Sequence, residues 1–158
     1  MSTVTHDQAN LMLRLYEMRR EARLREAREW FGMNFHVKSL EELMQKFPFG
    51  SKENTNMRMV ASYWDMCASI VNRGLIDDEL YFESNGEAWM VWERLRQIAP
   101  AWRAAFSNPQ LFINLEKLCG RLEAWREKIS PGSVAKNREM MNQMIQKAME
   151  TRKQSAAN

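Results

Sequence analysis

Acidic side chains gather in one short stretch of the 158-residue chain, and carboxylate oxygens are the ligands that hard cations such as Mg²⁺ and Ca²⁺ prefer. The stretch contains Asp77, Asp78, Glu79, Glu83, Glu87 and Glu93, with no lysine or arginine between residues 74 and 93. Glu79, Glu83 and Glu87 are four residues apart, so one continuous helix would place them on a single face. The face fits a solvated surface, a metal site or a docking site for a basic partner. A solvated surface is the commonest of these three, and we therefore assign no metal ligand and no cofactor.

Other residues with chemical potential lack the partners that catalysis needs. His6 and His36 belong to no Glu-x-x-His pair, which excludes the ligand set of a di-iron bundle. Cys67 and Cys119 fall on apolar helical stripes, which is typical of buried reduced thiols, although the sequence also permits a disulfide. Phosphate-binding glycine loops and a Gly-x-Ser-x-Gly elbow are absent from the sequence. The sequence therefore predicts no catalytic residue and a protein that is not an enzyme.

Aromatic residues offer a second kind of site. The chain has six tryptophans and seven phenylalanines, most of which should fill the core between helices. A minority could instead line an apolar pocket for a small ligand. The candidates for that pocket are Tyr63, Trp64, Trp89 and Trp92.

These residues are positioned by a predicted helical hairpin over residues 59–102. Apolar residues recur at 59, 63, 66 and 70 and at 60, 64, 67 and 71, which indicates a helix with a wide apolar face. Gly74 can then adopt the left-handed conformation that ends a helix, and Asp77 can cap the next one. Asn85-Gly86 can bend the second arm, so this arm is either one helix or two.

Further helices are predicted on both sides of the hairpin. Thr5 opens a capping box and a helix that we extend to about Phe31, and Ser39 opens a short helix that ends near Phe47. Asn108-Pro109 should begin another helix. Its apolar residues have 4-3-4-3-4 spacing, which is typical of a contact between helices: Leu111, Leu115, Leu118, Leu122, Trp125 and Ile129.

The C-terminal segment carries a second apolar stripe. Pro131-Gly132 breaks the chain, and we predict a domain over residues 1–132 and a Met-rich basic helix or tail over residues 133–158. This last helix could dock on its own bundle, pair with a second copy of the chain, project, or stay disordered. We predict an interaction surface formed by Leu111, Leu115, Leu118, Leu122, Trp125, Met141, Met144, Ile145 and Met149.

Length and charge set the class of protein. A chain of 158 residues fits one domain, and the hydrophobic patterns predict an all-α, up-and-down bundle of five or six helices. The net charge of +3 comes mainly from residues 134–158, where five basic residues face two acidic ones. Glutamates interleave with the arginines of residues 14–28, so binding to nucleic acid should be weak. No apolar run is long enough to span a membrane, and we expect a cytoplasmic protein.

Two motifs suggest a family. The segment Arg73-Gly74-Leu75-Ile76-Asp77-Asp78-Glu79-Leu80 and the segment Trp89 to Pro100 resemble a bacterial family catalogued as domain of unknown function 4760, best over residues 57–106. The resemblance implies an α-helical fold and supplies no catalytic residues. It also implies that many relatives carry a membrane-spanning helix before the helical part, which this sequence does not have.

The sequence thus favours a non-catalytic interaction module that self-associates, with a homodimer as the expected state. An unidentified protein partner is left open. The alternative function is binding of a small apolar ligand in the aromatic-lined pocket.

Overall fold

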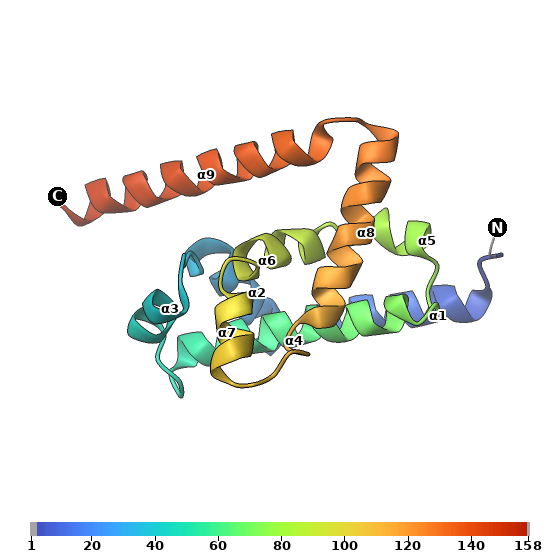
Figure 1. The fold of residues 1–158 in the computed structure, drawn as a ribbon, viewed down its shortest axis with the longest axis horizontal. Helices are drawn as coiled ribbons and strands as arrows, with labels where there is room; N and C mark the ends of the chain where they lie inside the picture. The colour runs from blue at the N-terminus through green and yellow to red at the C-terminus, as the bar shows by residue number, and fades with distance from the viewer. Residues whose placement is uncertain (1–2, 158) are drawn as a thin grey trace. The chain divides into compact units, whose positions relative to one another are not determined.

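The computed structural model describes residues 3–157, and every regular element in that range is an α-helix, which confirms the predicted all-α class. Figure 1 shows the helices along the described chain. They are α1 (His6–Arg19), α2 (Ala22–Asn34), α3 (Leu40–Lys46), α4 (Lys52–Asn72), α5 (Asp78–Phe82), α6 (Glu87–Leu95), α7 (Ala99–Ala105), α8 (Ile113–Ile129) and α9 (Ser133–Ala156). The predicted number of five or six helices is wrong, because the described chain has nine and the expected N-terminal helix is divided into α1 and α2. The up-and-down arrangement stays a prediction.

The chain forms two compact units, Met1–Gly120 and Arg121–Asn158. Their border lies within α8, so this helix contributes residues to both. The division predicted from the sequence, at residues 132 and 133, stays a prediction. Among the described residues, no helix combines the length and the apolar character that crossing a bilayer requires.

The first expected helix is interrupted at Glu21. We predicted one helix from Thr5 to about Phe31, but α1 ends at Arg19 and α2 begins at Ala22. The Glu21 carboxylate accepts hydrogen bonds from the backbone N–H groups of Arg23 and Leu24, both at 2.9 Å. It therefore caps α2 in the way that aspartate or serine usually does. The prediction failed because glutamate is seldom a helix N-cap.

The turn after α4 has the predicted geometry. Gly74 has φ of +74°, the region where a residue with a Cβ atom is strained. The N–H of Leu75 donates to the carbonyl of Ile70, and that of Gly74 donates to Val71, a pattern that defines a Schellman motif. Asp77 then accepts a hydrogen bond from the Leu80 N–H at 3.1 Å and caps α5.

The second arm of the hairpin consists of two helices, α5 and α6, which was one of the two alternatives that the sequence left open. The side-chain amide of Asn85 donates to the carbonyl of Tyr81 at 3.0 Å, close to the end of α5. Helix α6 starts two residues later, at Glu87. Local chemistry at Asn85-Gly86 therefore bends the chain where the sequence indicated.

The core of the unit Met1–Gly120 is built around α4. The predicted stripe of Val60, Trp64, Cys67 and Val71 is at most 1% exposed. Helix α2 packs along α4, and α6 also contacts it. Helix α1 is tied to the same core, because the buried Tyr63 hydroxyl donates to the carbonyl of Leu15 at 2.5 Å.

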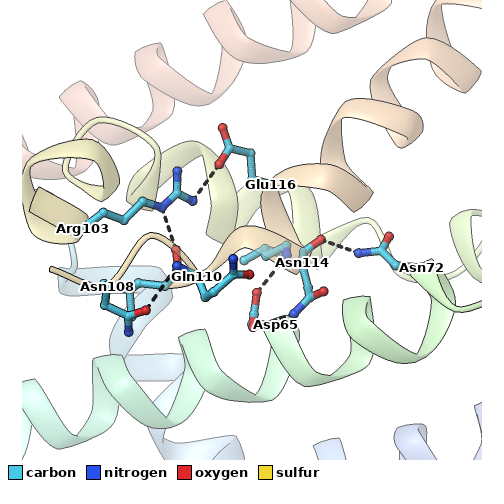
Figure 2. Close-up of polar contacts among 9 residues, drawn as sticks. Asp65, Asn72, Arg103, Asn108, Gln110, Asn114 and Glu116 are labelled. Carbon is cyan, nitrogen blue, oxygen red and sulfur yellow. Dashed lines mark hydrogen bonds and ion pairs between the residues drawn. The ribbon is translucent and has the colours of Figure 1, made fainter.

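The N-terminus of α8 is held by a side chain of α4 (Figure 2). One Asp65 oxygen accepts from the Leu115 N–H at 2.9 Å, and the other accepts from the Asn114 side-chain amide at 3.4 Å. The Asn72 side-chain amide donates to the Asn114 carbonyl at 3.0 Å. Asp65 thus acts as a helix cap although it lies about fifty residues away in the chain.

The predicted start of this helix at Asn108-Pro109 is wrong. The Asn108 side chain accepts from the Gln110 N–H in a turn, and α8 begins only at Ile113. Leu111 therefore lies before the helix, where its carbonyl accepts a hydrogen bond from Arg103 Nε at 2.8 Å (Figure 2). Phe112 has φ of +56°, and its buried ring packs edge-on against Trp102. The tertiary bonds to Asp65 and Arg103 override the local capping signal.

The unit Arg121–Asn158 contains the C-terminal part of α8, a turn, and helix α9. Gly132 has φ of +83°, and the Glu127 carboxylate accepts from the N–H groups of Gly132 and Val134 at 2.7 and 2.9 Å. Arg138 pairs with Glu123 at 2.9 Å. These contacts fix the first turns of α9 against the end of α8.

The glycine cap of α4 can be tested with one substitution at two sites. Gly74→Ala should lower the free energy of unfolding by about 1–2 kcal/mol, because alanine is strained at positive φ. Gly120→Ala in the interior of α8 should instead raise it by about 0.5–1 kcal/mol, since an added Cβ meets no atom within 4 Å there. Urea denaturation of both variants measures the difference. Equal midpoints for the two variants would contradict the role given to Gly74.

The cap supplied by Asp65 can be tested in the same way. Asp65→Ala should cost about 0.5–2 kcal/mol, because the Leu115 N–H loses its acceptor. Asp65→Asn, which keeps one oxygen acceptor, should cost less. Hydrogen exchange measured by NMR should show faster exchange at the Leu115 amide in the alanine variant. Exchange as slow as in the original protein would mean that α8 begins without this cap.

Candidate functional site

The acidic residues do not form the shared helical face that we predicted. Glu79 lies in α5, Glu83 follows it, and Glu87 begins α6, so the three are on different elements. That prediction is wrong because the chain bends at Asn85-Gly86. Within residues 3–157, no group of three or more His, Cys, Asp or Glu side chains is placed to hold a metal ion. Glu87 instead forms a two-pronged ion pair with Arg28, at 2.8 and 2.5 Å.

The two thiols are separate and buried in the core. Cys67 is 0% exposed and Cys119 is 1% exposed, and no disulfide joins them. Burial raises the pKa of the Cys67 thiol to about 11, with the hydroxyl groups of Tyr63 and Tyr81 acting in the opposite direction. Very little thiolate is therefore present at neutral pH, and Cys67 is a poor nucleophile.

The four aromatic residues predicted to line a pocket are all core residues. Tyr63, Trp64, Trp89 and Trp92 are between 0% and 8% exposed. Tyr63 and Trp64 pack edge-on, with ring centroids 5.1 Å apart, and the Arg19 guanidinium lies 5.7 Å from the Trp64 ring. These side chains fill space between helices.

The residues of the predicted interaction surface differ in their exposure to solvent. Leu115, Leu118 and Leu122 of α8 are at most 2% exposed in the single chain. Leu111 and Trp125 are half-buried, as are Met141 and Ile145 of α9. Met144 and Met149 are exposed, at 69% and 40%. The accessible part of the surface on α9 is the set Met141, Met144, Ile145 and Met149, which we name the α9 stripe.

A groove that the sequence analysis missed lies between α2 and α6, and we name it the α2–α6 groove. Its volume is about 480 Å³, within the usual range of small-molecule sites. Nine residues line it: Arg25, Arg28, Glu29, Phe31, Gly32, Glu87, Met90, Val91 and Arg94. Apolar side chains therefore share this space with charged groups.

Arg94 is a half-buried cation of this groove, and no carboxylate of the described chain pairs with it. Its Nη1 donates to the carbonyls of Phe31 and Gly32 at 2.7 and 2.9 Å, near the C-terminal end of α2. Its guanidinium also lies 5.7 Å from the centre of the Phe31 ring. Nε is buried without a hydrogen-bond partner, and within residues 3–157 no carboxylate forms an ion pair with Arg94. Burial lowers the pKa of this guanidinium, because no anion offsets the loss of water.

Sequence reasoning could not find this groove from spacing. Its residues come from two segments about sixty positions apart, and only the fold brings Arg94 beside Phe31. The one available signal was Arg94 itself, an arginine in the last turn of an otherwise largely apolar helix, α6. By contrast, the charge of Arg28 is balanced by its ion pair with Glu87, whose hydrogen bonds raise the pKa of Arg28.

The buried thiols give a prediction for chemical modification. At pH 8, an excess of a thiol reagent such as Ellman's reagent should react with neither Cys67 nor Cys119 on the timescale in which a free thiol reacts completely. In guanidinium chloride, both should react at once, because unfolding exposes them and returns the pKa of Cys67 to its ordinary value of 9.0. Absorbance at 412 nm counts the reacted thiols. Rapid reaction of the folded protein would show that the core opens readily.

Comparison with known proteins gives one match. The family described as Domain of unknown function (DUF4760) matches residues 4–122, which include α1 to α7, most of α8 and all residues of the α2–α6 groove. The searches of curated proteins and of solved structures gave no match. Because the matched range is well over half of the chain, the protein belongs to the DUF4760 family.

Proposed function

We propose that the protein is a non-catalytic helical interaction module that self-associates as a homodimer through the α9 stripe. The observation that carries this proposal is the exposure of a large apolar side chain, Met144 at 69%, in the middle of a helix of 24 residues. Met140 and Met149 are also exposed, at 50% and 40%. A continuous apolar stripe of this kind usually marks an interaction site.

The physical argument starts from the weakness of isolated helices in water. A helix gains most of its stability from covering an apolar face, and its intrinsic propensity contributes little. In α9 the first turns are covered, since Val134 is buried and Arg138 pairs with Glu123. Beyond these turns, the α9 stripe is half-buried or exposed along its whole length. A partner that covers the α9 stripe would bury this apolar surface, and burial of apolar surface stabilises the complex.

The charge of α9 favours a second copy as that partner. The segment 140–146, Met-Met-Asn-Gln-Met-Ile-Gln, contains no charged residue. Two copies of this segment can therefore meet without like-charge repulsion. A nucleic acid or an acidic membrane surface would need basic residues within the contact itself, and the segment 140–146 has none. A two-fold dimer is also the commonest arrangement among soluble oligomers.

The alternative function, binding of a small apolar ligand by Tyr63, Trp64, Trp89 and Trp92, has less support. All four side chains are buried, so a ligand would have to separate a packed core. We rank this alternative second. The sequence offers no catalytic motif that would support an enzymatic role.

Charged substitutions in the α9 stripe test the proposal on the full chain. The double variant Met144→Glu/Ile145→Glu should shift the protein from dimer to monomer, because a dimer would bury the new carboxylates against apolar groups. Light scattering after size-exclusion chromatography should give twice the 18.7 kDa chain mass for the original protein and the single mass for the variant.

The matched control is Gln143→Glu/Gln146→Glu, which adds the same charge to exposed positions on the polar side of α9. This variant should remain dimeric. A monomeric original protein at tens of micromolar, or two variants that dissociate equally, would contradict self-association through the α9 stripe.

A further inference from the structure

We propose that the α2–α6 groove binds a small amphiphile with one negative charge, such as a medium-chain fatty acid. Its carboxylate would pair with Arg94, and its apolar chain would lie against Phe31, Met90 and Val91. This site is separate from the α9 stripe, because all its residues belong to the unit Met1–Gly120.

The charged end of the ligand follows from the bonds of Arg94. This guanidinium uses Nη1 for two backbone carbonyls, which are neutral, and its buried Nε has no partner. A half-buried cation without an anion loses hydration that nothing replaces, and an added carboxylate would offset that cost. Arginine also matches a carboxylate geometrically, since two of its N–H groups can donate in parallel.

The apolar end follows from the other lining residues. Phe31 and Val91 are each 3% exposed and form an apolar base, and Met90, 45% exposed, stands at the open side. The volume of about 480 Å³ suits a small ligand. Methionine adapts its shape to a flexible chain better than branched side chains do. The groove therefore combines a surface for hydrocarbon with a half-buried cation, Arg94, that no carboxylate of the described chain pairs.

The charge balance of the groove limits the ligand to a single charge. Arg28 and Glu87 neutralise each other across the groove. Arg25 is exposed without an ion pair in the described chain, and it lies near the exposed carboxylate of Glu29, which also lines the groove. One net positive charge then remains for the ligand. A polyphosphate or nucleic acid would meet Glu29 and find too few cations.

Binding of decanoate and of 1-decanol, measured by isothermal titration calorimetry on the full chain, tests the proposal. The two probes have the same chain length and differ in charge. Decanoate should bind, and 1-decanol should bind about ten-fold more weakly or worse, because it lacks the charge-assisted hydrogen bonds to Arg94. Arg94→Met should weaken decanoate by a similar factor and leave 1-decanol nearly unchanged. Arg14→Met, an exposed arginine on α1 outside the groove, is the matched control and should have no effect.

Met90→Glu keeps the test decisive if Arg94→Met fails to fold, since Arg94 also bonds to α2. Met90 is exposed, so its substitution should leave the circular dichroism spectrum unchanged and still repel decanoate. The proposal is overturned if decanoate shows no binding at millimolar concentration, or if 1-decanol binds equally well. Unchanged decanoate binding in Met90→Glu would also overturn it, because the ligand would then occupy another place.

Discussion

The burial of one side of α4 is the constraint on which the unit Met1–Gly120 depends. Val60, Trp64 and Cys67 are completely buried, and a helix with so wide an apolar face must be covered by several others. Helices α2 and α6 provide this cover. The more polar side of α4 has a separate role, because Asp65 reaches out from it to fix the start of α8. The Schellman motif at Gly74 then ends α4 at the point where the chain must reverse.

The sequence predicted those features whose cause is local. Gly74 and Asp77 act through their own backbone and their nearest N–H groups, so their residue types were sufficient. The sequence failed where a distant group competes with a local signal. Asn108 caps only a turn, and α8 begins instead at the position where Asp65 accepts hydrogen bonds. Asp65 approaches α8 only in the folded chain, so the sequence could not show this. The α2–α6 groove could not be predicted for the same reason, since its chemistry arises from helices that meet in space.

The two proposed sites differ in their relation to the family. The groove lies within the matched residues 4–122, so its residues can be compared among DUF4760 proteins. The α9 stripe begins at Met141 and lies outside the match. Self-association through α9 would therefore be a property added to the family domain, whereas ligand binding in the groove would belong to the domain itself. The two sites also rely on different physics, exposed apolar area in one and a half-buried cation without an ion pair in the other.

Two glutamates, Glu21 before α2 and Glu127 near the end of α8, accept hydrogen bonds at the starts of α2 and α9 and make these two helix starts sensitive to acid. Hydrogen bonds from Arg23 and Leu24 lower the pKa of Glu21, and those from Gly132 and Val134 lower the pKa of Glu127. A carboxyl group with a lowered pKa in the folded chain contributes stability above its ordinary value of 4.5 and loses that contribution as the pH falls further. Both caps are therefore intact throughout the neutral range. In acid, protonation removes the acceptor of two backbone N–H groups at each break, and α2 and α9 would fray at their first turns together.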